Sequence, residues 1–94
     1  MFSKSVYKIP NGKLVKINLE YNEDTNKIMN IKIMGDFFAY PEEAIDVLEK
    51  NLINTVIKKN SLFDKINKVI KSNNFEFIGI NPEGLTESIL RCLN

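Results

Sequence analysis

The chain has 94 residues, 44% of them hydrophobic and 27% charged, which is typical of one small folded domain and not of a disordered chain. Its 13 basic and 12 acidic residues nearly balance, and Arg91 is the single arginine, so a nucleic-acid partner is not expected. The chain has no histidine, which excludes a histidine-ligated metal site. Its one cysteine, Cys92, cannot form an internal disulfide, which excludes a disulfide-stabilised domain. Without a signal-peptide core or a long apolar run, we expect a cytoplasmic protein with no membrane contact.

Three strands are predicted in the first third of the chain. Residues 6–9 are short and apolar-rich, and Pro10-Asn11-Gly12 marks a turn. Residues 13–21 and 27–34 alternate between apolar and polar side chains, and a polar loop of hairpin length, residues 22–26, joins them. The side chains expected on the buried side are Val15, Ile17, Leu19 and Tyr21, followed by Met29, Ile31 and Ile33. An antiparallel meander with one core-facing side is therefore predicted.

The remaining residues change to the spacing of helices. A first helix is expected from Pro41 to Leu52, and a second from Ser61, the expected cap, to Asn73-Asn74. Residues 75–80 fit either a short strand or a packed loop. A last helix is expected from the cap Asn81 through Leu93. We predict one α+β domain over residues 1–94, a three-stranded meander followed by three helices packed on one face.

The residue inventory offers no catalytic centre. Without histidine there is no Ser-His or Cys-His pair, and the four glycines lie too far apart for a phosphate-binding loop. The adjacent carboxylates Glu42-Glu43 have an explanation at a helix start, and Glu23-Asp24 have one in a turn. Cys92 is either a reactive thiol or, as is commoner for a cysteine on an apolar helix side, a buried one. No catalytic or metal-binding residue is predicted.

One segment has unusual local character, at the passage from the third strand to the first helix. It places a glycine, a single charge and three aromatic rings close together, and its candidate interface residues are Gly35, Asp36, Phe37, Phe38 and Tyr40. In one interpretation, one phenylalanine fills the core and the other rings pack near it. In the other, consecutive aromatics cannot all point inwards, so at least one is available to a partner.

The same segment and its flanks resemble the carboxy-terminal domain of lipoate–protein ligases. The resemblance rests on Gly35-Asp36-Phe37-Phe38, on Pro41-Glu42-Glu43 and on the pattern Ile45, Leu48, Glu49 and Leu52. Upstream, Gly12-Lys13-Leu14-Val15-Lys16-Ile17 resembles the opening strand of that domain, and downstream Ile80-Asn81-Pro82-Glu83 with Leu85 resembles its closing helix. The resemblance covers residues 5–93 and departs from the family pattern at residues 54–60, which are neutral to basic.

The resemblance implies an accessory role. In this family the large domain holds lipoate, ATP and Mg²⁺, forms lipoyl-adenylate, and passes the lipoyl group to a lysine of a lipoyl carrier domain. The small domain packs against the large one and takes part in activation, and in archaea the two are sometimes separate proteins. Because Met1 lies just ahead of the first strand, we expect a non-catalytic small subunit in a heterodimer with the large catalytic subunit. No catalytic residue and no cofactor of its own are implied for this chain.

Two other classes of function remain open at this point. An iron–sulfur scaffold or sulfur-transfer protein has a similar fold, but its chemistry needs clustered or exposed cysteines, and Cys92 stands alone. A general interaction module with an unrelated partner predicts no effect on lipoate chemistry. An iron-binding or persulfide assay tests the first alternative. Lipoate-dependent ATP–pyrophosphate exchange by a matching large subunit, with and without this chain, distinguishes the second from the accessory role.

Overall fold

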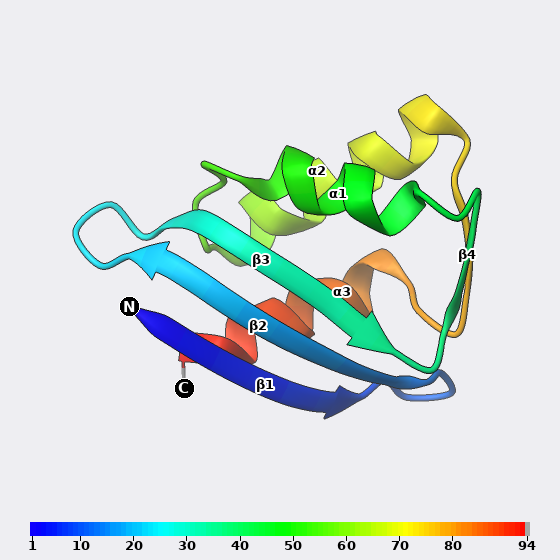
Figure 1. The fold of residues 1–94 in the computed structure, drawn as a ribbon, viewed down its shortest axis with the longest axis horizontal. Helices are drawn as coiled ribbons and strands as arrows, with labels where there is room; N and C mark the ends of the chain where they lie inside the picture. Colours follow the sequence, from blue (N-terminus) through cyan, green and yellow to red (C-terminus); the bar gives the residue numbers. More distant parts are fainter. Residues whose placement is uncertain (94) are drawn as a thin grey trace.

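The structure, a computed structural model that describes residues 1–93, consists of two layers (Figure 1). A three-stranded antiparallel sheet in the order β1-β2-β3 forms one layer, and three helices cover one of its faces. The bounds are β1 (Phe2–Lys8), β2 (Leu14–Asn22), β3 (Lys27–Gly35), α1 (Ala44–Leu52), α2 (Lys59–Asn73), α3 (Pro82–Leu90) and a 3₁₀ turn (Arg91–Leu93). The predicted α+β class, with a meander followed by helices on one face, is confirmed.

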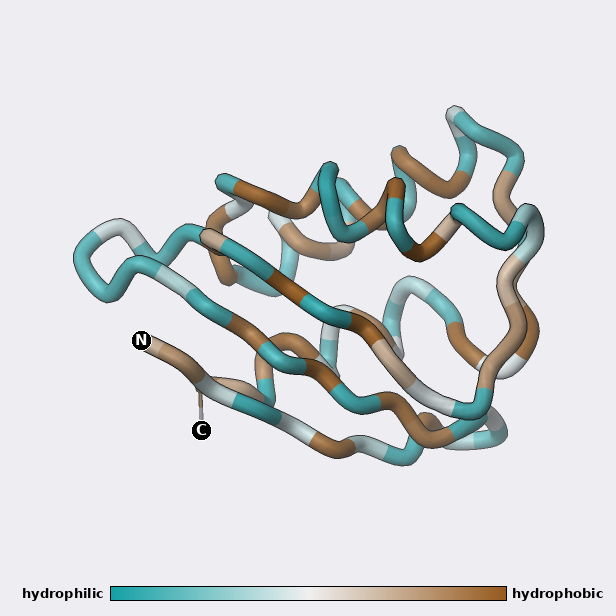
Figure 2. Tube along the Cα trace, viewed as in Figure 1, coloured by the Kyte–Doolittle hydropathy of each residue, from teal (hydrophilic) through white to brown (hydrophobic). Residues whose placement is uncertain are grey.

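The core lies between the sheet and the helices. Along β2, hydrophobic and hydrophilic positions alternate (Figure 2), and the buried hydrophobic side chains of the helices belong to the same core cluster as those of the sheet. The central strand contributes Val15, Ile17 and Leu19, all buried as the alternation predicted. Fully buried helix side chains complete the core: Leu48, Leu52, Leu62, Ile66, Leu85 and Ile89.

The third strand departs from the predicted alternation at Met29. This side chain was expected on the buried side, but it is 50% exposed and Ile28 is buried in its place. A β-bulge causes the difference, since Glu20 pairs with Asn30 whereas Tyr21 pairs with Ile28. The extra residue shifts the alternation by one position, so Ile28, Ile31 and Ile33 share the inner face.

The first strand is longer than predicted and is polar on its inner side. It begins at Phe2, and Val6 points to solvent while Ser3, Ser5 and Tyr7 face the helices. Ser3 donates a hydrogen bond to the carbonyl of Cys92, and Ser5 Oγ donates to the carbonyl of Ser88 at 2.6 Å. Small hydroxyl side chains allow the end of the last helix to lie close to the strand. Because Ser3 and Ser5 on the inner side are polar, hydrophobic alternation did not reveal the first part of the strand, residues 2–5.

Two helices begin at residues other than those predicted. Residues 41–44 form a turn in which the Ala44 N–H donates to the Pro41 carbonyl at 3.0 Å, so α1 starts at Ala44 and not at Pro41. The second helix starts at Lys59 without a side-chain cap, so Ser61 lies inside its first turn and is not the cap. At the last helix, Asn81 caps as predicted and accepts from the Gly84 N–H at 2.6 Å. None of the helices in residues 1–93 is both long and apolar enough to cross a bilayer.

Residues 75–80, for which a strand and a loop were both open, contain a short strand. This strand, β5 (Glu76–Ile78), pairs antiparallel with β4 (Phe38–Tyr40). We call the two-stranded unit the ribbon. It stands at one end of the two layers, at the right-hand edge of Figure 1, where β4 leads from the sheet to α1 and β5 leads from α2 to α3.

The outer edge of β3 is closed by a buried carboxylate. Glu49 on α1 is only 9% exposed, and its Oε2 accepts a hydrogen bond from the backbone N–H of Ile33 at 2.7 Å. Its Oε1 lies 3.9 Å from Lys32 Nζ. The side-chain oxygen of Asn30 accepts from the Ile31 N–H at 2.9 Å. Side chains thus occupy donors that an added strand would otherwise use.

Replacing Glu49 with alanine is expected to lower the free energy of unfolding by about 2 kcal/mol, because the buried Ile33 N–H loses its acceptor. Urea denaturation followed by circular dichroism measures the effect. Glu49→Gln is the matched control, since its amide oxygen can still accept this hydrogen bond, and it should remain within about 1 kcal/mol of the native chain. Equal denaturation midpoints for Glu49→Ala and the native chain would contradict this role.

Candidate partner-binding site

The ribbon presents an apolar patch to solvent. Its inward side chains, Ala39 and Phe77, are half-buried, whereas the outward side chains of Phe38, Tyr40 and Ile78 are 62%, 52% and 50% exposed. Phe38 and Ile78 are direct cross-strand partners, so their side chains lie next to each other on the outer face. We call Phe38, Tyr40 and Ile78 the ribbon patch. Three large exposed side chains on one short element are typical of a surface that binds a partner.

Two glycines fix the position of the ribbon against the turn between β1 and β2. The carbonyl of Gly79 accepts from the Lys13 N–H at 2.8 Å, and the carbonyl of Leu14 accepts from the Asp36 N–H at 3.4 Å. At Gly35, a Cβ atom would collide with the Leu14 carbonyl oxygen. At Gly79, φ is 96°, a conformation that favours glycine. These contacts hold the start of β4 and the end of β5 against the β1–β2 turn, so the main fold fixes the orientation of the ribbon patch.

The five candidate interface residues therefore have different places in the structure. Phe38 and Tyr40 belong to the exposed patch, and Asp36 is exposed beside it. Phe37 is half-buried and packs against the core, which leaves it less available to a partner. Gly35 is constrained by close packing, which is a structural role. The interpretation in which one phenylalanine fills the core and the other rings pack near it fits Phe37 but not Phe38 and Tyr40, whose side chains are largely exposed.

Ile78, the third member of the patch, was not among the candidates. Its local sequence, Phe75 to Ile80, is apolar apart from Glu76 and Gly79 and does not show that Ile78 lies beside another exposed side chain. Only the pairing of β5 with β4 places Ile78 beside Phe38. This pairing joins residues far apart in the sequence, so the patch is a tertiary feature.

Acidic side chains flank the ribbon patch along the chain. No lysine or arginine occurs between Ile33 and Glu49, whereas Asp36, Glu42 and Glu43 in this stretch are exposed. Glu76 pairs with Tyr40 across the ribbon and is also exposed. An apolar patch with these acidic neighbours, and with the exposed Lys13 packed against Gly79, fits a partner surface that has an apolar recess with charged groups beside it.

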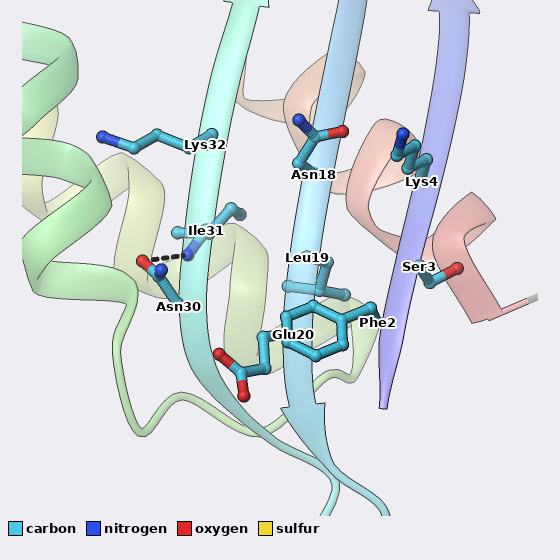
Figure 3. Close-up of a pocket in the computed structure, with 9 residues that line it drawn as sticks. All are labelled: Phe2, Ser3, Lys4, Asn18, Leu19, Glu20, Asn30, Ile31 and Lys32. Carbon is cyan, nitrogen blue, oxygen red and sulfur yellow. Dashed lines mark hydrogen bonds between the residues drawn. The ribbon is translucent and has the colours of Figure 1, made fainter.

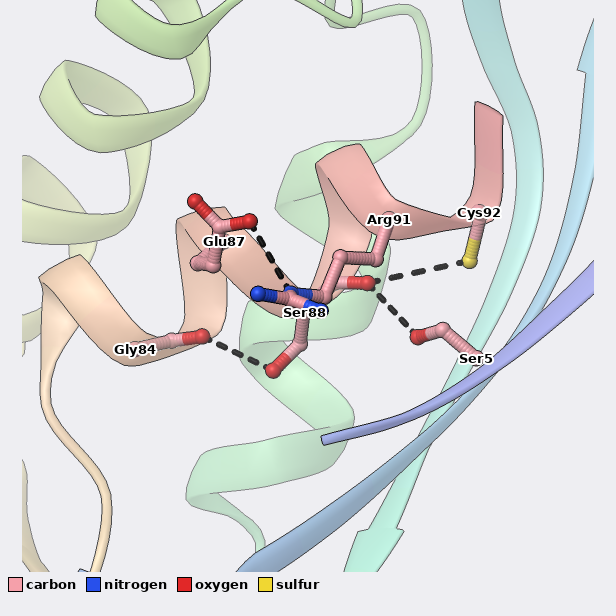
Figure 4. A network of polar contacts seen from close by, with 6 residues as sticks. All are labelled: Ser5, Gly84, Glu87, Ser88, Arg91 and Cys92. Carbon is pink, nitrogen blue, oxygen red and sulfur yellow. Dashed lines mark hydrogen bonds and ion pairs between the residues drawn. The ribbon is translucent and has the colours of Figure 1, made fainter. Parts of the chain in front are cut away.

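Cys92 lies in a different region and is not an exposed nucleophile. It is 5% exposed, and its Sγ lies 3.8 Å from the Ser88 carbonyl, which also accepts from Ser5 Oγ (Figure 4). Burial raises the pKa of the thiol, and a side-chain hydrogen bond with Ser5 opposes this only in part. The prediction of a buried cysteine is confirmed, and a buried protonated thiol does not suit sulfur transfer or cluster assembly.

The Cys92 thiol is expected to react with Ellman's reagent at pH 8 at least about 100-fold more slowly in the folded chain than in urea. Burial raises the pKa of this thiol in the folded state. At neutral pH the thiol is protonated in both the folded and the unfolded chain, so its ionisation does not affect stability. Above the ordinary thiol pKa the unfolded chain loses this proton first, so the free energy of unfolding falls. Denaturation at pH 7 and pH 9.5 tests this, with Cys92→Ala as the control that should lose less stability. Equal reaction rates in the folded and unfolded states would contradict the burial of the thiol.

Residues 1–93 bring together no group of three or more histidine, cysteine, aspartate or glutamate side chains that could hold a metal ion. The features that stand out are instead an anchored ribbon and its exposed apolar patch. Together with the two-layer fold, they define a small α+β domain with a candidate partner-binding surface.

Comparison with known proteins identifies the family. Residues 8–89 match the family described as the bacterial lipoate protein ligase C-terminus, and the chain belongs to this family. It is similar to lipoate-protein ligase A subunit 2 of Thermoplasma acidophilum, with 33% identity over 92 residues that make up 95% of this chain and 87% of the relative. It is also similar in structure to a chain solved in work on an archaeal lipoylation system, a bi-partite lipoate protein ligase and its E2 lipoyl domain from the same organism. The TM-score of this comparison is 0.70, and the identity is 28% over 95% of this chain and 94% of the other.

Proposed function

We propose that this chain is the accessory small subunit of a two-part lipoate–protein ligase. The observation that carries the proposal is its similarity over nearly its whole length to a protein named as the second subunit of such a ligase. The solved relative, from work on a bi-partite ligase, supports the same assignment. In this proposal the chain forms a one-to-one heterodimer with the large catalytic subunit, and the apolar ribbon patch contributes to the contact.

The reaction assigned to the pair has two steps. In the first, a carboxylate oxygen of lipoate attacks the α-phosphorus of ATP, which forms lipoyl-adenylate and releases pyrophosphate. In the second, a deprotonated lysine amine of the carrier domain attacks the lipoyl carbonyl, which forms an amide and releases AMP. Lipoate, ATP and Mg²⁺ act at the catalytic subunit, and this chain has no histidine and a single, buried cysteine.

The need for a second subunit follows from the chemistry of the intermediate. An acyl-adenylate is a mixed anhydride that water hydrolyses, so a ligase benefits from a cover that excludes solvent during activation. A rigid small domain that presents an apolar patch at one end suits such a cover. We therefore assign this chain a role in the first step, the ATP-dependent activation of lipoate.

The test is lipoate-dependent ATP–pyrophosphate exchange by the matching large subunit, measured with and without this chain. We expect exchange to require both proteins and to saturate at equimolar amounts. A large subunit that is equally active alone would exclude a role in activation and would favour a general interaction module. The assay needs no carrier domain, so it tests activation separately from transfer.

A further inference from the structure

The face of the sheet that points away from the helices is not covered by any of residues 1–93, and we call it the open face. The strand register places Lys4, Asn18 and Lys32 in one row across β1, β2 and β3. Phe2, which is 78% exposed, lines a shallow hollow of about 490 Å³ on this face together with Lys4 and Lys32 (Figure 3). The open face is thus a second accessible surface, separate from the ribbon patch in its composition.

The open face is strongly basic although the whole chain is nearly neutral. Lys4, Lys8, Lys16 and Lys32 are exposed on it, and Glu20 is its one carboxylate. The remaining nine basic and eleven acidic residues of the chain leave the other surfaces net negative. Lys32 Nζ lies 3.9 Å from a Glu49 oxygen, but no carboxylate oxygen of residues 1–93 lies within 4.0 Å of the other three lysines. Their charges are therefore available to a partner.

We infer that the open face is a transient docking surface for the carrier domain that accepts the lipoyl group, and that this domain meets it with an acidic surface. The inference rests on the proposed function and extends it from the activation step to the transfer step. The carrier domain must bind and leave in every catalytic cycle. A surface of solvent-exposed lysines suits that demand, because long-range attraction speeds association while solvated charges keep the complex short-lived.

The composition of the open face argues against the catalytic subunit as its occupant. Lysine is depleted from the centres of stable interfaces, where apolar and aromatic side chains predominate. The ribbon patch gathers its apolar side chains on one short element, whereas on the open face the exposed Phe2, Val6 and Met34 are interspersed with lysines. Nucleic acid is also a poor fit, since the open face has no arginine and Phe2 is its single aromatic side chain, whereas single-stranded nucleic acids are bound by several stacking rings.

The experiment uses the reconstituted two-subunit ligase with the variant Lys4→Glu/Lys16→Glu, which reverses two exposed charges outside the core. With an isolated apo lipoyl domain as acceptor, we expect the KM for that domain to rise at least about 10-fold and kcat to change little. The KM of the native complex should rise with ionic strength more steeply than that of the variant. ATP–pyrophosphate exchange should be unchanged, because activation does not involve the carrier. Lys58→Glu/Lys68→Glu on the helical side is the matched control, and its KM should equal the native value.

Three results would overturn the inference. An unchanged KM for the apo lipoyl domain in Lys4→Glu/Lys16→Glu would show that the carrier does not use the open face. Loss of exchange or of the heterodimer in this variant would place the catalytic subunit there. Competition by a single-stranded oligonucleotide at physiological salt would identify a nucleic-acid surface. If the proposed function itself were wrong, ATP–pyrophosphate exchange by the large subunit would be the same with and without the native chain, which none of these three results implies.

Discussion

Replacing Phe38 with alanine is expected to weaken association with the catalytic subunit by about 2 kcal/mol, or about 30-fold in Kd, while the chain stays folded. Phe38 is 62% exposed at the centre of the ribbon patch and lies next to Ile78. Its ring contributes little to the core, so truncation should remove contact area from the interface and not from the fold. Isothermal titration calorimetry of the two purified subunits measures the change directly.

Met29→Ala is the control for that measurement. Met29 is also a large exposed apolar side chain, but it lies near the loop between β2 and β3, at the end of the sheet opposite the ribbon. Its removal should leave the Kd within about twofold of the native value. If Phe38→Ala binds as tightly as the native chain, the ribbon patch is not the anchor. If Met29→Ala weakens binding as much, the effect is not specific to the patch.

Replacing Gly35 with alanine is expected to lower the free energy of unfolding by about 2–4 kcal/mol. A Cβ atom at this position would overlap the backbone carbonyl oxygen of Leu14. The same Cβ atom would lie 3.1 Å from two carbons of the Phe37 ring. A carbonyl in a paired strand cannot rotate away as a flexible side chain would, so the strand end or the ribbon must shift. Thermal denaturation gives the loss of stability, and calorimetry gives the accompanying loss of affinity for the catalytic subunit.

Asp36→Ala is the neighbouring control, because Asp36 is exposed and its side chain makes no hydrogen bond or ion pair within residues 1–93. It should change the free energy of unfolding by less than about 0.5 kcal/mol. The role assigned to Gly35 requires a clear difference between these two variants. A Gly35→Ala chain with native stability and native affinity would mean that the ribbon is not held by this close packing.

Much of the candidate site could be located from the sequence, but its composition could not. The run of aromatic residues after β3 left two interpretations open, and in one of them Phe38 or a neighbour was available to a partner. Local sequence could not separate Phe37, which packs against the core, from Phe38, because the direction of each ring depends on the pairing of β4 with β5. Ile78 was missed for the same reason, and Gly35 was assigned to the interface because its contact with Leu14 is not a local property.

The sequence by itself determined the features that depend on neighbouring residues. These were the order of strands and helices, the buried face of β2, the Asn81 cap and the family resemblance, because periodicity and capping act over a few positions. Only the tertiary structure decided the bulge that exposes Met29, the inward serines of β1, the burial of Glu49 against Ile33, and the ribbon. Each of these features depends on contacts between different elements, which form only when the strands pair and the layers pack together. The pattern of neighbouring residues therefore does not predict them.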